Sequence, residues 1–262
     1  MAMQEVPNVL AIDVGNTRVR LASVKGEAVT DPQAFSAASA GEIGPAVANL
    51  WQQMPEPRRV AASSVNATAL AAVEQAVAEA IDQDVLVVGR DLPLPIDADL
   101  PHPESVGTDR LCAAAAAFDR LGTACVVADC GTAITVDCVD GEGRFLGGAI
   151  LPGLAMGASA LAAGTARLTN VQPRRPDWVF GKDTEQAIIG GLVFSARGAL
   201  RMLTEAYATE LGHWPLLILT GGDAELIAAE DTDVRQLVRA IVPDLSLRGV
   251  AMAYYRLLLG PQ

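Results

Sequence analysis

The chain has 262 residues, of which 51% are hydrophobic and 19% are charged, and its formal net charge is −12. This composition is that of a globular protein rather than a disordered one. The acidic balance excludes broad binding to nucleic acid or to an anionic membrane, because both need a basic footprint. A small phosphate compound is not excluded, since backbone N–H groups, a metal ion and one or two arginines can hold it.

The sequence contains no pattern that predicts membrane insertion or export. No uninterrupted apolar run approaches the roughly 20 residues that a membrane span needs. Residues 1–8 lack the basic start of a signal peptide, so we expect a cytoplasmic protein. The cysteines form no CxxC pair and lie in apolar segments, which favours buried free thiols over metal ligands. They are Cys112, Cys125, Cys130 and Cys138.

The first half of the sequence predicts three adjacent strands followed by alternating helices and strands. In chain order, we expect strands at 8–13, 17–24 and 28–35, a helix at 42–54, a strand at 59–64, a helix at 66–81, a strand at 85–88, a loop at 90–106 and a helix at 107–121. The loop is rich in proline and aspartate, which few helices tolerate.

The second half repeats this order. We expect strands at 124–130, 133–139 and 144–150, a helix ending near 168, a polar connection at 170–182, a helix or helix pair at 183–212, a strand at 216–219, a helix after 222, a short strand near 241 and a helix at 246–259. The repetition predicts a duplicated α/β fold with mixed sheets, divided into an N-terminal half at 1–118 and a C-terminal half at 119–262.

An Asp-x-Gly turn ends the first strand of each half. The two copies are Asp13-Val14-Gly15-Asn16-Thr17 and Asp129-Cys130-Gly131-Thr132-Ala133. The glycine lets the backbone approach a phosphate, and the polar side chains that follow it add hydrogen-bond donors. A carboxylate beside a phosphate needs a cation between them, so Asp13 suits Mg²⁺, and Asp129 suits either a metal ion or a role in orienting the turn. Each copy alone could be an ordinary hairpin turn, but the recurrence favours two halves that face a nucleotide across a cleft.

A second kind of site is predicted where the helix at 107–121 begins. Its first residues are Gly107-Thr108-Asp109-Arg110. The free N–H groups of a helix start favour an anion, Arg110 can bind a carboxylate with two hydrogen bonds, and Asp109 can accept a proton from a substrate hydroxyl. The alternative is structural: Asp109 stabilises the helix dipole and Arg110 lies on the surface.

Six segments together resemble the type III pantothenate kinases of bacteria, which belong to the acetate and sugar kinase, Hsc70 and actin superfamily. The segments are Asp13–Thr17, Gly107–Arg110, Asp129–Thr135, Gly147–Gly153, Phe180–Thr184 and Thr220–Gly222, in this order over nearly the whole chain. The resemblance implies a duplicated ribonuclease H-like, actin-like ATPase fold, with two halves of mixed five-stranded-type sheets flanked by helices around a central cleft. It also implies ATP-dependent phosphorylation of pantothenate to 4′-phosphopantothenate, the first step of coenzyme A biosynthesis.

The resemblance further implies roles for individual residues. Asp109 would be the proton acceptor, Asp13 would lie near Mg²⁺, and Asp129 would bind a monovalent cation, K⁺ or NH₄⁺. The implied ATP-binding residues are Asp13, Val14, Gly15, Asn16, Thr17, Arg18, Val19, Arg20 and Thr132. The implied pantothenate-binding residues are Gly107, Thr108, Asp109, Arg110 and Thr184. The family is homodimeric, which makes the helix after Thr184 a candidate dimer element, and Leu100 stands where the family often carries tyrosine.

Two other functions stay open at this point. One is a kinase of the same superfamily that acts on another hydroxy acid, since a fold does not determine its substrate. The other is a non-catalytic nucleotide-binding regulator. Arg110 beside Asp109 favours a hydroxy-carboxylate over a neutral sugar, and the joint presence of Asp13, Asp109 and Asp129 favours an enzyme over a binding protein.

Overall fold

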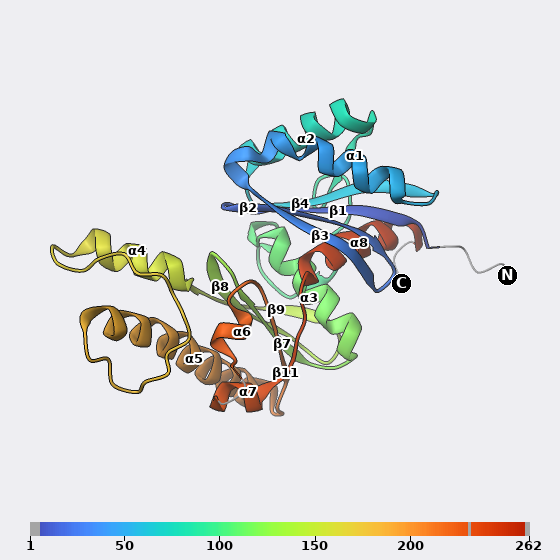
Figure 1. Cartoon of the computed structure of the whole chain (residues 1–262). Coiled ribbons are helices and arrows are strands. Elements are labelled where there is room, and N and C mark those ends of the chain that lie inside the picture. Colours follow the sequence, from blue (N-terminus) through green and yellow to red (C-terminus); the bar gives the residue numbers. More distant parts are fainter. Residues whose placement is uncertain (1–5, 230–231, 260–262) are drawn as a thin grey trace. The chain divides into compact units, whose positions relative to one another are not determined.

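The computed structural model describes residues 6–229 and 232–259, and its contacts divide the chain into two compact units (Figure 1). Unit 1 comprises Met1–Arg120 and Asp244–Gln262, and unit 2 comprises Leu121–Pro243. This division differs from the predicted halves at the C-terminal end. The last helix belongs to unit 1 because Leu247 and Val250 are buried in a core with strand residues such as Val9.

Unit 1 contains a mixed sheet of five strands in the order β3-β2-β1-β4-β5. Its strands are β1 (Asn8–Val14), β2 (Arg18–Lys25), β3 (Ala28–Ser36), β4 (Arg58–Ser64) and β5 (Val85–Val87). The pairs β1–β2 and β2–β3 are antiparallel, whereas β1–β4 and β4–β5 are parallel. Every residue of β1 is buried, which explains why this central strand is a nearly continuous apolar run in the sequence.

Helices cover both faces of the unit 1 sheet (Figure 1). Its helices are α1 (Gly44–Gln53), α2 (Ala67–Ile81), α3 (Thr108–Leu121) and α8 (Leu245–Leu259), with 3₁₀ turns at Ala37–Ile43 and Pro103–Ser105 and a two-residue strand β6 (Asp97–Ala98). Alternate residues of β1 point to opposite faces. Leu10 joins the core formed with α1 and α2, and Val9 joins the core formed with Cys112 of α3 and with α8.

Unit 2 repeats the strand order of unit 1. Its five strands, β9-β8-β7-β10-β11, are β7 (Cys125–Cys130), β8 (Ala133–Val139), β9 (Arg144–Pro152), β10 (Leu216–Thr220) and β11 (Val238–Ile241). The pairs β7–β8 and β8–β9 are antiparallel, whereas β7–β10 and β10–β11 are parallel. Unit 2 therefore has the strand order and directions of unit 1, as expected for a duplicated fold.

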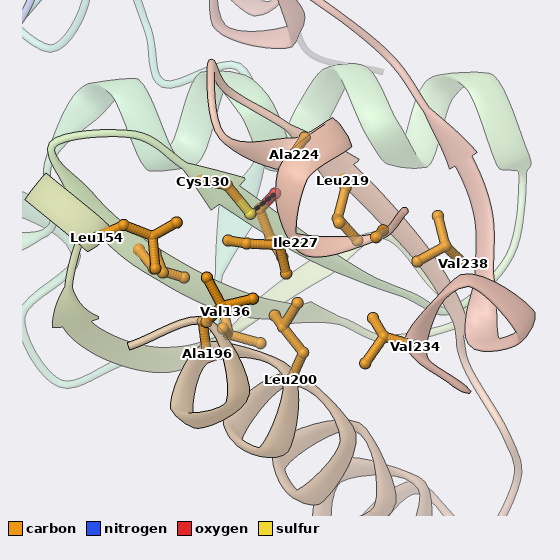
Figure 2. Packing of buried hydrophobic residues seen from close by; sticks show 14 of the residues in the cluster. Cys130, Val136, Leu154, Ala196, Leu200, Leu219, Ala224, Ile227, Val234 and Val238 are labelled. Atoms are coloured by element: carbon orange, nitrogen blue, oxygen red, sulfur yellow. Dashed lines mark hydrogen bonds between the residues drawn. The ribbon is translucent and has the colours of Figure 1, made fainter. Parts of the chain in front are cut away.

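The helices of unit 2 bury one face of this sheet. They are α4 (Leu154–Gly164), α5 (Thr184–Leu211), α6 (Ala224–Ile227) and α7 (Asp233–Leu237). Figure 2 shows Leu154, Leu200 and Ile227, from three different helices, in one cluster with Val136 of β8. The region 183–212 forms one continuous helix rather than a pair. Asp183 caps its start, and Gly212 ends it in a left-handed conformation.

One predicted boundary is wrong in this unit. Helix α4 ends at Gly164 rather than near Leu168, because Thr165 has an extended backbone (φ −137°, ψ 150°). The Thr165 hydroxyl then accepts a hydrogen bond from the backbone N–H of Leu168 at 3.2 Å, which holds these residues in a turn.

Among the described residues, α5 is the one helix with the length and apolar composition of a membrane span, with a mean hydropathy of 1.3 over its most apolar window. A core helix of a globular unit has the same properties. Ile188, Ile189, Val193 and Leu200 of α5 are buried in the cluster of Figure 2, so its apolar face serves the core of unit 2.

Helices α3 and α8 approach each other so closely at Gly249 that one added methyl group there should destabilise the fold. A Cβ at Gly249 of α8 would lie 2.0 Å from the backbone oxygen of Cys112 in α3. We expect Gly249→Ala to lower the free energy of unfolding by about 2 kcal/mol or more, as overpacking does. Gly198→Ala in α5 is the control, because no atom lies within 4 Å of its new Cβ, and it should leave stability unchanged or raise it by up to ~1 kcal/mol. Urea unfolding measures both, and equal stabilities would contradict the close contact.

Candidate functional site

Asp13 lies near the carboxyl end of β1 and is only 7% exposed. Its parallel neighbour on β4 is Ser63, and its antiparallel neighbour on β2 is Arg20. The Ser63 hydroxyl donates to Asp13 Oδ1 at 2.8 Å, and the Arg20 guanidinium donates to Asp13 Oδ2 at 2.8 Å. The two neighbouring strands thus hold this buried carboxylate by a hydrogen bond on each oxygen.

A third donor comes from the far end of the chain. The hydroxyl of Ser246, in the first turn of α8, donates to Asp13 Oδ2 at 2.8 Å and accepts from Arg20 at 2.6 Å. Arg20 also lies 3.6 Å from the carboxylate of Asp244. No motif in the sequence singles out Ser63, Asp244 or Ser246. The pairing of strand ends could have indicated Ser63, whereas no local pattern connects residues 244–246 with β1.

The turn after Asp13 presents polar groups to solvent. Gly15 donates its N–H to the backbone oxygen of Arg18 at 2.9 Å, and a Cβ at Gly15 would lie 3.1 Å from that oxygen. Asn16, Thr17 and Arg18 are exposed at the tip of the turn. The side chains of Val14 and Val19 are instead fully buried in the core, so only their backbone groups could contact a ligand.

The start of α3 is fixed to the end of β4. The Thr108 hydroxyl accepts from the N–H of Ser64 at 3.1 Å and donates to the carbonyl of Ser64 at 3.2 Å. Asp109 Oδ1 accepts from the N–H of Arg110 at 2.8 Å. A Cβ at Gly107 would lie 2.5 Å from the same Oδ1, so a side chain at this position would displace the Asp109 carboxylate from this orientation.

The charges of both Asp13 and Asp109 act on the buried thiol of Cys112 in α3. Complete burial raises its pKa well above the usual range, and the charges of Asp13 and Asp109 raise it further. Both carboxylates therefore lie within electrostatic range of one side chain, at the end of the sheet where α3 begins. Because a thiolate is the nucleophilic form of cysteine, Cys112 is not a candidate nucleophile.

Asp129 of unit 2 occupies the strand position that Asp13 occupies in unit 1. It pairs with Thr135 on β8 and with Thr220 on β10, where Asp13 pairs with Arg20 and Ser63. The hydroxyl of Thr220 is buried and has no hydrogen-bond partner among the described residues. Gly221 follows with φ +91°, and a Cβ there would lie 2.5 Å from Asp129 Oδ1.

The turn after Asp129 is closed by backbone contacts. Gly131 donates its N–H to the oxygen of Ala133 at 3.1 Å, and Gly153 donates to the oxygen of Thr132 at 3.2 Å. A Cβ at Gly153 would lie 2.3 Å from the oxygens of both Gly131 and Thr132, which explains the Pro-Gly turn after β9. The pKa of the Cys130 thiol is raised by burial and then by the charges of Asp129 and Asp223, so both acids lie near this turn.

Thr184 is the first residue of α5 and is exposed. The side chain of Asp183 caps this helix by accepting the N–H of Gln186 at 2.7 Å. The predicted site residues Asp13 to Arg20 and Gly107 to Arg110 belong to unit 1, and Asp129, Thr132 and Thr184 belong to unit 2.

The acidic residues do not form a dedicated metal cage. Within residues 6–229 and 232–259, no three or more His, Cys, Asp or Glu side chains are grouped to hold a metal ion. Mg²⁺ in nucleotide sites keeps several waters and uses one or two carboxylates with phosphate oxygens. The buried, hydrogen-bonded carboxylate of Asp13 fits that kind of ligand set, whereas zinc or iron would need more side chains.

Comparison with known proteins gives a consistent result. Residues 9–206 match the family described as type III pantothenate kinase. A type III pantothenate kinase of Dehalococcoides mccartyi is 32% identical over 252 residues, covering 94% of this chain and 96% of the relative. One from an Anaeromyxobacter species is 34% identical over 254 residues, covering 94% and 98%.

Solved structures also share the fold. A ROK hexokinase from Thermus thermophilus superposes with a TM-score of 0.50 at 14% identity, covering 97% of this chain and all of that chain. At this identity the likeness concerns the fold alone. It confirms the expected actin-like ATPase fold, whose repeated strand order both units contain.

Proposed function

The chain belongs to the type III pantothenate kinase family, and we propose that it uses the residues around Asp13, Asp109 and Asp129 to transfer the γ-phosphoryl group of ATP to pantothenate. The product is 4′-phosphopantothenate, and the reaction is the first step of coenzyme A biosynthesis. The observation that carries the proposal is the family match over residues 9–206, which contains all three acidic residues.

Asp109 is the proposed acceptor of the proton from the primary hydroxyl of pantothenate. It stands at the start of α3, where Gly107 leaves room for its carboxylate and Thr108 fixes the helix to β4. Phosphoryl transfer requires little covalent chemistry from the protein, so positioning of the hydroxyl in line with the γ-phosphorus provides most of the acceleration. Arg110 and the N-terminus of α3 supply positive charge for the pantothenate carboxylate, and Thr184 adds a hydroxyl.

Asn16, Thr17, Arg18 and Thr132 are the proposed donors to the phosphates of ATP, together with the backbone of the turn at Gly15. The exposed tip after β1 supports this assignment, because its polar groups are not used in the core. A divalent ion such as Mg²⁺, held by Asp13, would neutralise charge on the phosphates during transfer. The residues of the chain bind and orient the nucleotide around that ion.

Asp129 is the proposed ligand of a monovalent cation, K⁺ or NH₄⁺. The support is the concentration of oxygen atoms at the end of β7 and β10, where the buried Thr220 hydroxyl has no partner among the described residues. Hard cations of this kind take oxygen ligands. The glycine at position 221 leaves space next to the carboxylate.

Replacing the proposed proton acceptor tests the reaction directly. We expect Asp109→Asn to lower kcat for pantothenate-dependent ADP release by about 100-fold or more, because general base catalysis contributes factors of this size. Asp82→Asn is the matched control. Asp82 ends α2 in a left-handed conformation that asparagine also adopts, and it lies far along the chain from the proposed site residues of α3 and β1.

The acceptor panel should include sugars and other hydroxy acids. ADP release without pantothenate, or an equal rate with another acceptor, would contradict the proposed substrate. A full rate for Asp109→Asn would contradict the role of Asp109 alone.

The cation assignment predicts a separate effect. Activity should depend on K⁺ or NH₄⁺ and be lower with Na⁺, and Asp129→Asn should raise the K⁺ concentration for half-maximal activity by about tenfold, since a charged ligand is lost. Steady-state rates at fixed MgATP measure this. A variant with the wild-type K⁺ dependence would remove Asp129 from the cation site.

A homodimer is proposed as well, in the cytoplasm and without nucleic acid or membrane partners. The homodimer is supported by large apolar side chains that are exposed in unit 2, on α5 and just before it. Phe180 is 75% exposed, Phe194 45% and Met202 64%. The first turn of α5 carries Thr184, so the same element would serve both the interface and the pantothenate site.

A charge on this surface should separate the subunits. We expect Phe194→Glu to shift the mass measured by light scattering after gel filtration from dimer to monomer, because a buried unpaired carboxylate is costly. Ala71→Glu, on an exposed position of α2, adds the same charge elsewhere and should leave the mass unchanged. A dimeric Phe194→Glu variant would show that the interface lies elsewhere.

A further inference from the structure

We propose that Ser246, in the first turn of α8, is a positioning residue that determines which oxygen of Asp13 faces the divalent cation of the bound nucleotide. The proposal rests on the proposed role of Asp13 as the carboxylate next to Mg²⁺. It adds a residue from the C-terminal helix to a site that the sequence indicates only through the Asp13 turn.

The two carboxylate oxygens of Asp13 accept different numbers of hydrogen bonds. Oδ2 accepts from the Ser246 hydroxyl and from Arg20, both at 2.8 Å, whereas Oδ1 accepts from the Ser63 hydroxyl, also at 2.8 Å. A carboxylate oxygen accepts about two hydrogen bonds. The acceptor capacity of Oδ2 is therefore filled, and Oδ1 retains a position for a cation or for one of its waters.

The Ser246 hydroxyl forms hydrogen bonds with both other side chains of this group, Asp13 and Arg20. Arg20 donates to the Ser246 oxygen at 2.6 Å and to Asp13 Oδ2 at 2.8 Å, so the three side chains form a triangle of hydrogen bonds. The terminal torsion of an aspartate is broad and has no steep barriers of its own. Without the serine hydroxyl, one bond to Oδ2 and one acceptor of Arg20 are lost, and the carboxylate is freer to turn.

Asp244 acts on the same group through Arg20. Its carboxylate lies 3.6 Å from one terminal nitrogen of Arg20, while the other terminal nitrogen contacts Asp13. The positive charge of Arg20 is thus shared between two carboxylates, which leaves more negative charge on Asp13 for a cation. Asp244 has φ +58°, a conformation that aspartate and asparagine adopt more readily than most residues.

The position of Ser246 in the helix also favours a role beyond packing. The neighbouring residues Leu245 and Leu247 are fully buried, and Ser246 is itself only 1% exposed. A buried hydroxyl is costly unless it is hydrogen-bonded, and the Ser246 hydroxyl is bonded to both members of the charged pair Asp13 and Arg20. Residue 246 lies outside the segment 9–206 that matches the family.

The test compares Ser246→Ala with Ser246→Thr, which keeps the hydroxyl. Binding of ADP is measured by calorimetry on the full chain, once with Mn²⁺ and once in EDTA without a divalent ion. We expect Ser246→Ala to weaken binding of ADP with Mn²⁺ by about tenfold, the effect of one hydrogen bond to a charged group, and to leave binding in EDTA unchanged. Ser246→Thr should recover affinity to within about threefold of the wild type.

Two further variants complete the experiment. Thr204→Val removes another fully buried hydroxyl, which donates to the backbone oxygen of Leu200, and it should leave both affinities unchanged. Asp244→Asn keeps the size and backbone preference of its residue and should weaken only the Mn²⁺-dependent binding, by about threefold. It serves as the test if Ser246→Ala does not fold.

The outcomes separate this proposal from the function of the protein. Wild-type affinity for ADP with Mn²⁺ in Ser246→Ala, or in a folded Asp244→Asn when the alanine variant is unfolded, would overturn it. So would an equal loss with and without Mn²⁺, because Ser246 would then act on the nucleotide or on the fold. These are binding results and do not depend on pantothenate, whereas absence of pantothenate-dependent ADP release by the wild type would contradict the proposed function instead.

Discussion

The parallel pairing of the first strand with the fourth is the contact on which both candidate sites depend. In unit 1 it aligns Asp13 with Ser63, and in unit 2 it aligns Asp129 with Thr220. Parallel strands deliver their carboxyl ends to one edge of a sheet, which is where open α/β sheets bind ligands. Each acidic residue is consequently held between a strand that begins the unit and one that arrives much later in the chain.

The two copies of this arrangement differ in charge. Asp13 has Arg20 as its neighbour on the second strand and is hydrogen-bonded by two serines, whereas Asp129 has Thr135 at the corresponding position. A carboxylate tied to an arginine by one oxygen is held in a defined orientation. A carboxylate among threonine hydroxyls is better suited to a weakly hydrated monovalent ion. The duplicated backbone thus gives its two acidic residues different surroundings, in line with the different cations that we propose for them.

Much of the fold was predictable because its signals are local. Apolar runs indicate the central strands, and the Asp-x-Gly turns lie where the strands end. Asn66 and Asp183, residue types that favour helix starts, cap α2 and α5. The C-terminal helix could not be assigned to unit 1 from the sequence, because its partners, such as Val9, are more than 200 residues away. The same separation hides the link between Ser246 and the Asp13 turn, since hydrogen bonds between distant segments leave no pattern in the sequence.

The return of α8 to unit 1 has a consequence for how the protein is made. The core of unit 1 contains residues from the first strand and from α8, and all of unit 2 lies between them in the chain. During synthesis the ribosome therefore completes unit 2 before unit 1 can close, although unit 1 begins first. Domains tend to fold as units while the chain emerges. The nascent N-terminal sheet must wait with one apolar face covered by α3 but not yet by α8, and loss of the last helix by premature termination would damage the N-terminal unit rather than the C-terminal one.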